Sequence, residues 1–328
     1  MQFIDKVYRW KPQYWLIFTG HIITTSIQKG IVISRYGNRA EIEDENGQLI
    51  SCHIRRALTD LVTGDRVTWE INEAEDSDFN GVITSREQRD SVLERPIRYQ
   101  GLKAVAANID HIYVVTAIEP PFSARILDRY LVAITQTGIE SSLVLNKTDL
   151  ISSGHEVYEQ MKIYEDLGYN ILQVSSFTPE SLLTLNNSLS NKTSVFVGQS
   201  GVGKSSLVNA LLPGTDTAVA ELSDNSGLGT HTTTTSRLYR LPGGGILIDS
   251  PGIREFGMDH LEPSEIAMGF IEIAEFSESC KFRDCHHIKE PGCAVKAACN
   301  SGEIHPQRYE NYLHLYEEAA SAQADKPF

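Results

Sequence analysis

The amino-acid sequence predicts a multi-domain protein with an N-terminal β-barrel, a central α/β domain and a C-terminal helical domain. Three observations predict this order. Short strand-like segments separated by turns come first, apolar runs alternating with helical stretches follow, and a cysteine-rich loop lies among helical segments near the end. We expect an N-terminal extension at residues 1–19, the barrel at 20–98, the α/β domain at 99–262 and the helical domain at 263–328.

The bulk composition is that of an ordinary globular protein. A chain of 328 residues is long enough for two or three domains with separate cores. No stretch reaches the roughly 18 consecutive apolar residues of a membrane span. The nearest candidate for an export signal, Tyr14–Ile23, is short, contains His21 and has no small-residue cleavage site behind it. We therefore expect a cytoplasmic protein that makes no membrane contact.

The net charge of −14 limits the kinds of partner that we expect. It provides no overall basic field, so any binding to nucleic acid must depend on local patches of Lys and Arg. The five cysteines favour metal binding or chemistry over disulfides, because disulfides are rare in cytosolic proteins.

The first element is the β-barrel. Between Gly20 and about Arg95 the sequence alternates short strands with turns, and the pairs Asn46–Gly47 and Asn80–Gly81 are hairpin signals. Five short strands in so few residues favour a small barrel, with the OB-fold as the leading candidate. The stretch Arg89–Gly101 contains a proline and mixed charges and is typical of a linker.

The second element is the α/β domain, which begins near Asn108. Its apolar runs alternate with helical stretches, and runs of this kind form strands that are buried on both faces of a parallel sheet. The predicted strands are HIYVVTAI, SSLVLN, NILQVSS, SVFVGQ, RLYRL and ILIDSPG.

A phosphate-binding loop follows one of these strands. The segment Gly198–Ser205, GQSGVGKS, matches G-x-x-x-x-G-K-[ST] between a strand and a helical stretch, a context that makes a chance match rare. Its glycines let backbone N–H groups turn towards phosphates, and the helix N-terminus adds a positive end. Lys204 is predicted to contact the β- and γ-phosphates, and Ser205 to bind Mg²⁺. The residues predicted to contact the nucleotide here are Gly198, Gln199, Ser200, Gly201, Val202, Gly203, Lys204, Ser205 and Ser206.

A second motif, LIDSPG, ends the last apolar strand. In phosphate-loop enzymes an Asp at this position holds Mg²⁺, so Asp249 is a predicted Mg²⁺ ligand. The backbone N–H of Gly252 is predicted to approach the γ-phosphate. The alternative is an ordinary exit from strand to turn, because Asp, Ser, Pro and Gly are all turn residues.

A third motif, NKTD at Asn146–Asp149, precedes the phosphate-binding loop by about fifty residues. The carboxylate of Asp149 can accept two hydrogen bonds from the N1–H and N2–H₂ edge of guanine, whereas adenine offers the opposite pattern. Asn146, Lys147 and Thr148 complete the predicted base-binding loop. The alternatives are a solvated loop, or a phosphate-loop kinase or ATPase, which Asp149 disfavours.

These motifs resemble the G1, G3 and G4 motifs of the translation-factor-type GTPases. The pair Ser175–Ser176 resembles their G5 motif, and the threonine run GLGTHTTTTSRL resembles G2. The motifs stand in the order G4-G5-G1-G2-G3 instead of G1 to G5. The central domain is therefore similar to a circularly permuted P-loop GTPase domain, a rearrangement that keeps the sheet while moving the termini.

The cysteine-rich loop, CKFRDCHHIKEPGC, contains three thiols and two histidines, and such ligands suit a closed tetrahedral zinc site with a structural role. Spacing alone does not choose between the two histidines. Isolated buried cysteines are the alternative. Cys299 is a spare cysteine nearby, and Cys52 is predicted to lie in the barrel core.

Taken together, the barrel, the permuted domain and the cysteine cluster resemble the RsgA/YjeQ family of small-ribosomal-subunit-dependent GTPases. This resemblance selects one zinc and the ligands Cys280, Cys285, His287 and Cys293. It implies a GTP hydrolase that acts in late maturation of the small (30S) ribosomal subunit and is stimulated by it. The implied partners are GTP or GDP with Mg²⁺, the small subunit and its 16S rRNA. We expect a monomer.

The catalytic group is the least determined feature. Ras-like enzymes place a Gln after the D-x-x-G motif to orient water, but this chain has Ile253 there. His231, beside the threonine run, is the candidate replacement, with an exposed loop histidine as the alternative. Thr233 is predicted to bind Mg²⁺, with Thr232 and Thr234 as rivals. A nucleotide-switched RNA-binding scaffold with negligible hydrolysis is the alternative function.

Overall fold

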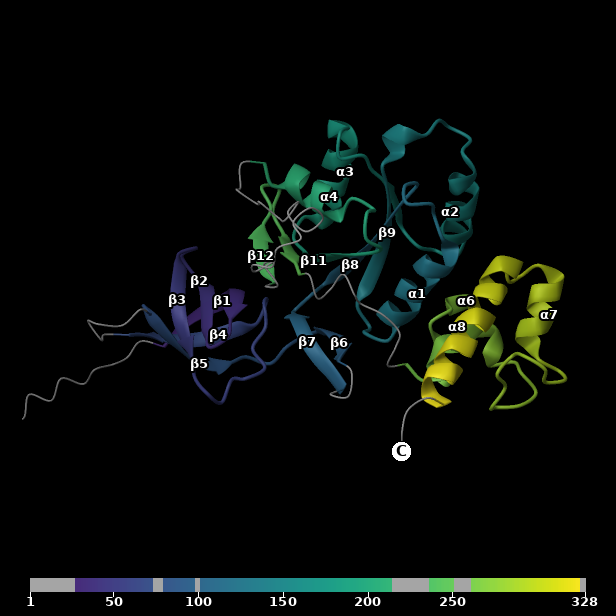
Figure 1. Cartoon of the computed structure of the whole chain (residues 1–328), viewed down its shortest axis with the longest axis horizontal. Coiled ribbons are helices and arrows are strands. Elements are labelled where there is room, and N and C mark those ends of the chain that lie inside the picture. Colours follow the sequence, from purple (N-terminus) through teal and green to yellow (C-terminus); the bar gives the residue numbers. More distant parts are fainter. Residues whose placement is uncertain (1–26, 73–78, 98–100, 214–235, 251–260, 325–328) are drawn as a thin grey trace, which may run out of the picture.

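The structure is a computed structural model, and it describes residues 27–72, 79–97, 101–213, 236–250 and 261–324. The barrel lies at one end, the α/β domain in the middle and the helical domain at the other end (Figure 1). This confirms the predicted order of architectures. The predicted extension, residues 1–19, lies outside the described residues.

Five strands form the closed N-terminal barrel. They follow the order β1-β2-β3-β5-β4, and β4 pairs back onto β1. Only the β3–β5 pairing within this barrel is parallel. This arrangement confirms the predicted OB-like barrel. The strands are β1 Gln28–Tyr36, β2 Arg39–Asp44, β3 Leu49–Ile54, β4 Arg66–Ile71 and β5 Gly81–Arg86.

The barrel interior is filled by alternate residues of these strands, as the two-residue period of a strand requires. Cys52 belongs to this core and is fully buried, and burial raises the pKa of its thiol to about 12. The prediction that this cysteine is structural is confirmed. The other core residues are Val32, Ala40, Ile42, Ile54, Leu61, Val67, Trp69 and Ile83.

The predicted linker contains a strand. Strands β6 (Val92–Ile97) and β7 (Gly101–Ala107) pair antiparallel as a two-stranded sheet. Pro96 lacks the N–H that an inner strand would need, and a two-stranded ribbon tolerates this loss because each strand is an edge. The N–H of Ala107 donates to the carbonyl of Thr63 at 3.0 Å, which ties the hairpin to the barrel.

In the described part of the α/β domain, six strands form a sheet in the order β10-β9-β8-β11-β13-β12. All neighbouring pairs are parallel except β12 with β13, so the predicted parallel sheet has one antiparallel strand at this edge. Strand β12 also pairs with β1 of the barrel, at Arg237 and Ser34. The strands are β8 His111–Ala117, β9 Glu140–Asn146, β10 Ile171–Gln173, β11 Thr193–Val197, β12 Arg237–Arg240 and β13 Ile246–Asp249.

Helices cover both faces of this sheet. Side chains of α1 (Ala124–Thr135) and α2 (Glu156–Asp166) join one buried cluster. Those of α3 (Pro179–Leu189) and α4 (Lys204–Leu211) join another on the opposite face. Strand residues alternate between the two clusters, so the central strands are buried on both sides.

The C-terminal region is helical, as predicted. Its helices are α5 Pro263–Met268, α6 Ile271–Ser277, α7 Ala294–Ser301 and α8 Pro306–Ala324. Helix α8 packs against α1 and α5, and its buried residues join the same core as α1 and α2. The helical region is therefore fixed to one face of the α/β domain.

Candidate functional site

The predicted site residues gather at one edge of the central sheet. Strands β8, β9, β11 and β13 are parallel, so their carboxyl ends meet there. Asn146 ends β9, Gly198 follows β11, and Asp249 ends β13. Open α/β sheets bind ligands at this edge.

Two positions of the phosphate-binding loop require glycine because of their backbone conformation and their close neighbours. Gly198 has a φ of +139°, and an added Cβ would lie 2.1 Å from the carbonyl oxygen of Val115. Gly203 has a φ of +93°, and its added Cβ would lie 2.4 Å from Nδ2 of Asn146. A side chain at either position would meet both backbone strain and a steric clash.

Lys204 begins α4 and is 8% exposed. Its Nζ donates to the carbonyls of Gly198 and Gln199, the latter at 2.7 Å. The ammonium group is thus held over the loop at the N-terminus of a helix, where positive charge already accumulates. Ser205 and Ser206 follow in the first turn of α4.

Side chains of the NKTD segment contact the phosphate-binding loop directly. Nδ2 of Asn146 donates to the carbonyl of Val202 at 2.9 Å, and Nζ of Lys147 donates to the carbonyl of Gly201 at 2.9 Å. Lys147 has a φ of +62°. Two segments about fifty residues apart in the chain therefore form one site, as the permuted order predicts.

The segment predicted to resemble G5, Ser175–Ser176, lies beside the NKTD segment. The N–H of Thr148 donates to the carbonyl of Val174 at 3.2 Å, immediately before Ser175 and Ser176. Oγ of Ser175 accepts from the N–H of Phe177 at 3.1 Å, and Ser175 is buried. Asp149 is exposed at this edge.

One buried acceptor in this site lacks a partner. Asn146 is 1% exposed, and its Oδ1 has no hydrogen-bond partner among the described residues. An unsatisfied buried oxygen costs free energy, so it favours a ligand or water that brings a donor.

Sequence reasoning missed the segment that follows β8. The carbonyl of Glu119 accepts from Nζ of Lys147 at 2.6 Å, and Cδ of Pro120 would lie 3.4 Å from a Cβ placed on Gly201. The available signal was the tripeptide EPP, just after an apolar strand that ends at the same edge.

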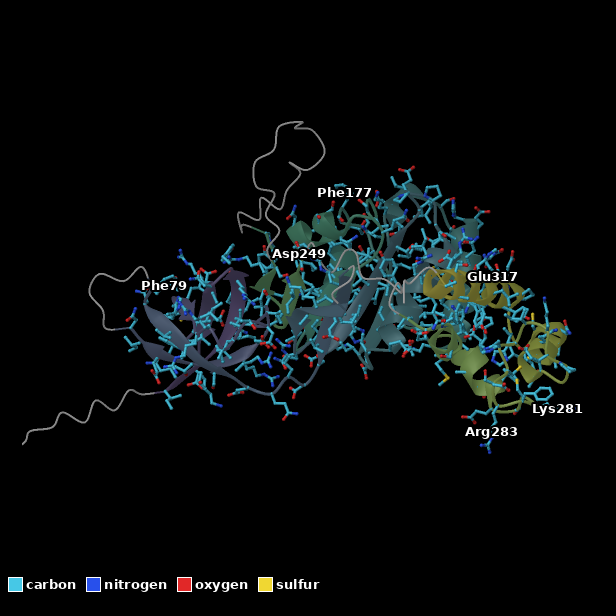
Figure 2. All side chains as sticks on the ribbon, turned by 60° about the horizontal axis from the view of Figure 1, so that its bottom comes forward. Phe79, Phe177, Asp249, Lys281, Arg283 and Glu317 are labelled. Atoms are coloured by element: carbon cyan, nitrogen blue, oxygen red, sulfur yellow. The ribbon has the colours of Figure 1, made fainter. Side chains whose placement is uncertain are left out.

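Asp249 (labelled in Figure 2) is the last residue of β13 and pairs with Arg237 in the register of β12. Ser250, which follows it, accepts a hydrogen bond from Ser236. The predicted roles of His231, Thr233 and Gly252 fall on residues outside the described part of the chain. These three assignments therefore remain predictions.

A separate group of four potential metal ligands lies in the helical region. One ligand atom from each residue lies within 4.8 Å of every other, and the residues are Cys280, Cys285, His287 and Cys293. Nδ1 of His287 is 3.5 Å from Sγ of Cys280 and 3.4 Å from Sγ of Cys293, and these two sulfurs are 3.9 Å apart. Sulfurs around a tetrahedral zinc with Zn–S bonds of about 2.3 Å lie roughly 3.8 Å apart, so the group fits zinc.

Neighbouring groups hold these ligands in position. Oγ of Ser277 donates to the carbonyl of Ile273 and lies 2.9 Å from Nε2 of His287. The backbone N–H of Ala294 donates to Sγ of Cys280 at 3.3 Å. Contacts of this kind orient metal ligands in proteins.

Comparison with known proteins identifies the family. The model of the family described as RsgA GTPase matches residues 86–259. The small ribosomal subunit biogenesis GTPase RsgA of Proteus mirabilis is 49% identical over 304 residues, which cover 91% of this chain and 86% of that protein. The corresponding protein of Haemophilus influenzae is 46% identical over 303 residues, 92% of this chain and 88% of that protein.

The chain belongs to the RsgA GTPase family.

Solved structures agree with membership of the RsgA family. YjeQ from Thermotoga maritima is 34% identical, covers 90% of this chain and 99% of its own, and has a TM-score of 0.72. YloQ, described as a circularly permuted GTPase, is 28% identical, covers 94% of this chain and 99% of its own, and has a TM-score of 0.71. The predicted RsgA/YjeQ resemblance, the permuted order and the GTPase class are confirmed.

Among the described residues, no helix is both long and apolar enough to cross a lipid bilayer.

Proposed function

We propose that this GTPase binds the small ribosomal subunit, assists its late maturation, and hydrolyses GTP at a rate that the subunit raises. The observation that supports the nucleotide site is the contact of Asn146 with Val202 and of Lys147 with Gly201. These contacts hold the predicted base-binding loop against the predicted phosphate-binding loop. The relatives that carry the name small ribosomal subunit biogenesis GTPase support the choice of partner.

In this proposal Asp149 accepts the two donors of the guanine edge. Its exposure leaves the carboxylate accessible to a ligand. The buried Oδ1 of Asn146, which lacks a partner among the described residues, fits a site completed by a bound molecule. Thr148, Ser175 and Ser176 form the rest of the base-binding edge.

The phosphates lie, in this proposal, over the backbone N–H groups of Gly198–Ser206, with Lys204 at the β- and γ-phosphates. Mg²⁺ neutralises phosphate charge when it is bound, and Ser205, Thr233 and Asp249 would hold it. Gly252 approaches the γ-phosphate, and His231 positions the attacking water. The assignments of Thr233, Gly252 and His231 rest on the sequence motifs alone.

The cluster of three cysteines and one histidine holds a single zinc with a structural role. Four protein ligands leave no open coordination position, so the metal takes no part in hydrolysis. We propose further that the protein is a cytoplasmic monomer, that it contacts 16S rRNA within the small subunit, and that its domains divide at residues 20–98, 99–262 and 263–328.

The deciding experiment measures GTP hydrolysis by the purified protein alone, with purified small subunits and with purified large subunits. We expect slow turnover alone, stimulation by small subunits and none by large subunits. A rate that small subunits leave unchanged would contradict the proposal and favour the nucleotide-switched scaffold.

The variant Asp149→Asn separates guanine recognition from the choice of partner. Losing two charge-assisted hydrogen bonds should weaken GTP binding by about 3 kcal/mol, or roughly a hundredfold. Xanthine has a carbonyl where guanine has its amino group, so the amide of the variant should restore binding of xanthosine triphosphate. Equal binding of GTP by the variant would remove Asp149 from the site.

A further inference from the structure

A cavity of about 430 Å³ lies where the barrel meets the α/β domain, and we call it the junction cavity. The barrel contributes Arg35 and Thr63, and the β6–β7 hairpin contributes Lys103. Ser236, just before β12, and Ser250, just after β13, also line the cavity. We propose that the junction cavity binds the phosphate group of an anionic ligand, at a site separate from the phosphate-binding loop.

Arg35 is fixed in this cavity and has no carboxylate partner among the described residues. Its Nε donates to the carbonyl of Gly37 at 3.0 Å, and Nη1 donates to the carbonyls of Thr59 at 2.8 Å and Leu61 at 2.6 Å. Carbonyl acceptors hold the guanidinium in place but leave its charge uncompensated. Nη2 keeps two N–H donors that make no hydrogen bond with the described residues.

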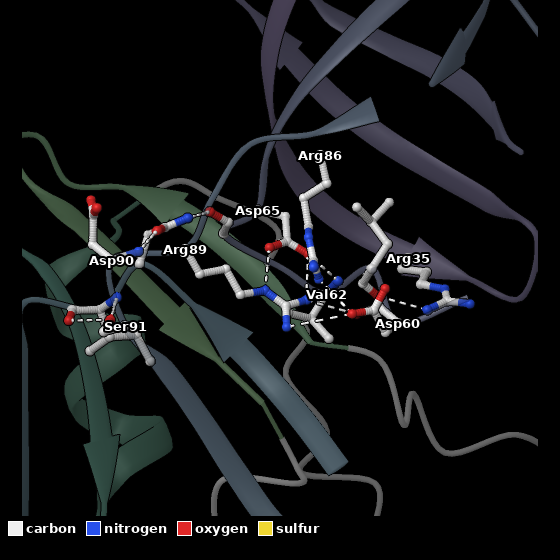
Figure 3. Close-up of polar contacts among 12 residues, drawn as sticks. Arg35, Asp60, Val62, Asp65, Arg86, Arg89, Asp90 and Ser91 are labelled. Carbon is white, nitrogen blue, oxygen red and sulfur yellow. Dashed lines mark hydrogen bonds and ion pairs between the residues drawn. The ribbon is translucent and has the colours of Figure 1, made fainter. Parts of the chain in front are cut away.

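The acids of the neighbouring loop are already paired with other arginines (Figure 3). The carboxylate of Asp60 lies 2.6 Å from Arg86, and the fully buried carboxylate of Asp65 accepts from Arg89 at 2.7 and 2.9 Å. These acids are therefore not available to neutralise Arg35.

The remaining charge around the junction cavity is also positive. Lys103 is exposed and forms no ion pair with the described residues, and Arg95 is a further cation in the lining. No Asp or Glu occurs among the described residues that line the cavity. Arg35 and Lys103 thus present positive charge that no lining acid among the described residues offsets, although the chain has a net charge of −14, and such charge attracts anions.

The donors favour phosphate among anions. Guanidinium and ammonium groups are the usual partners of phosphate oxygens, and Arg35 and Lys103 supply one of each. The cavity volume lies in the range of small-molecule sites. The phosphate can come from a small phosphate ester or from an RNA backbone, since both present the same oxygens.

A ligand here would touch the strands that lead to the nucleotide site. Ser250 directly follows Asp249, and Oγ1 of Thr63 donates to the carbonyl of Ser236 at 3.1 Å. If phosphate binding changes nucleotide affinity, nucleotide binding must change phosphate affinity by the same factor.

The test uses the full chain saturated with Mg²⁺ and a non-hydrolysable GTP analogue, so that the phosphate-binding loop is filled. Inorganic phosphate is titrated at constant ionic strength, and binding is followed by ³¹P NMR line broadening and by the shift of the melting temperature. We expect saturable binding that Arg35→Gln and Lys103→Gln each weaken at least tenfold. Arg125→Gln, which removes an exposed charge from α1, should bind like the wild type.

A single-stranded RNA hexamer without terminal phosphates forms the second arm. If the hexamer saturates the site through Lys103 and inorganic phosphate does not, the ligand is a nucleic-acid backbone. If neither probe gives saturable binding, or if Lys103→Gln binds both as the wild type does, the proposal is overturned. Lys103 is exposed, so its variant stays informative even if Arg35→Gln disturbs the barrel.

Discussion

The guanidinium of Arg308 in α8 lies between the carboxylates of Asp128 in α1 and Glu272 in α6. Its Nε and Nη2 donate to Glu272 at 2.7 and 3.0 Å, and Nη1 pairs with Asp128. Arg308 is 2% exposed. Burial opposes its charge, but the carboxylates of Asp128 and Glu272 raise the pKa of Arg308 above its usual value. The helical region is thereby joined to the α/β domain by a buried charge cluster.

Removing Arg308 should destabilise the protein strongly. The variant Arg308→Met leaves two buried carboxylates without their cation, which typically costs about 3–5 kcal/mol. The free energy of unfolding in urea measures this loss. The matched control is Arg129→Met, which breaks the partly exposed pair of Arg129 with Glu318 and should cost less than about 1 kcal/mol. Equal losses of unfolding free energy in the two variants would show that the buried cluster contributes no more stability than an exposed ion pair.

A methyl group on Gly203 should weaken nucleotide binding. The added Cβ lies 2.4 Å from Nδ2 of Asn146, so Gly203→Ala pushes the two loops apart in addition to straining the backbone. We expect at least about a tenfold loss of affinity for a fluorescent GTP analogue, equivalent to about 1.4 kcal/mol.

Gly154→Ala is the control for backbone strain. Gly154 has a φ of +98°, close to the +93° of Gly203, but its Cβ would meet nothing within 4 Å. It should therefore lower stability without lowering nucleotide affinity. Similar affinities for the two variants would refute the steric explanation.

Ser277 should position His287 for zinc. The hydroxyl hydrogen of Ser277 is directed to the carbonyl of Ile273, so its oxygen accepts from Nε2–H of His287 and leaves Nδ1 for the metal. Losing such a contact typically lowers metal affinity roughly 10- to 100-fold. Competition with a chromogenic chelator measures the change in Ser277→Ala, with the exposed Ser279→Ala as control. A variant that retains zinc as firmly as the wild type would contradict this role.

The buried His111 predicts a pH dependence of stability. Burial lowers the pKa of His111, the charge of Lys192 lowers it further, and Glu140 only partly opposes this. The unfolded chain therefore binds this proton more readily than the folded chain, so stability is full above the usual pKa of about 6.5 and falls as the pH drops below it. The variant His111→Gln should show a smaller loss of unfolding free energy between pH 7.5 and 5.5. The same loss in both proteins would exclude this histidine as the cause.

The sequence predicted the strands of the α/β domain because they are apolar runs, and β9, β11 and β13 are followed or ended by recognisable motifs. It missed the β6–β7 hairpin because Pro96 and mixed charges also describe a linker, and only pairing across the hairpin distinguishes the two. Likewise, the role of Glu119 depends on a backbone carbonyl, which no side-chain pattern reveals.

Spacing did not choose between the two histidines of the cysteine loop; the family resemblance selected His287, and the fold places it with the cysteines. The ring of His286 packs 5.5 Å from that of Tyr316, whereas the ring of His287 turns towards Cys280 and Cys293. The spacing in the chain is compatible with either arrangement. Arg308 and Asp128 are 180 positions apart in the chain, so no local sequence pattern could predict their pairing.

The permuted order has a consequence for synthesis on the ribosome. The loop that contains Asp149 emerges first, and the phosphate-binding loop that it contacts emerges about fifty residues later, several seconds at the usual 5–20 residues per second. Strand β11 can then pair with β8, and β13, which follows it in the chain, can add to β11 only after about fifty further residues. The predicted nucleotide site is therefore incomplete until most of the chain has been translated. The buried charge cluster of Arg308, Asp128 and Glu272 can form only near the end of translation.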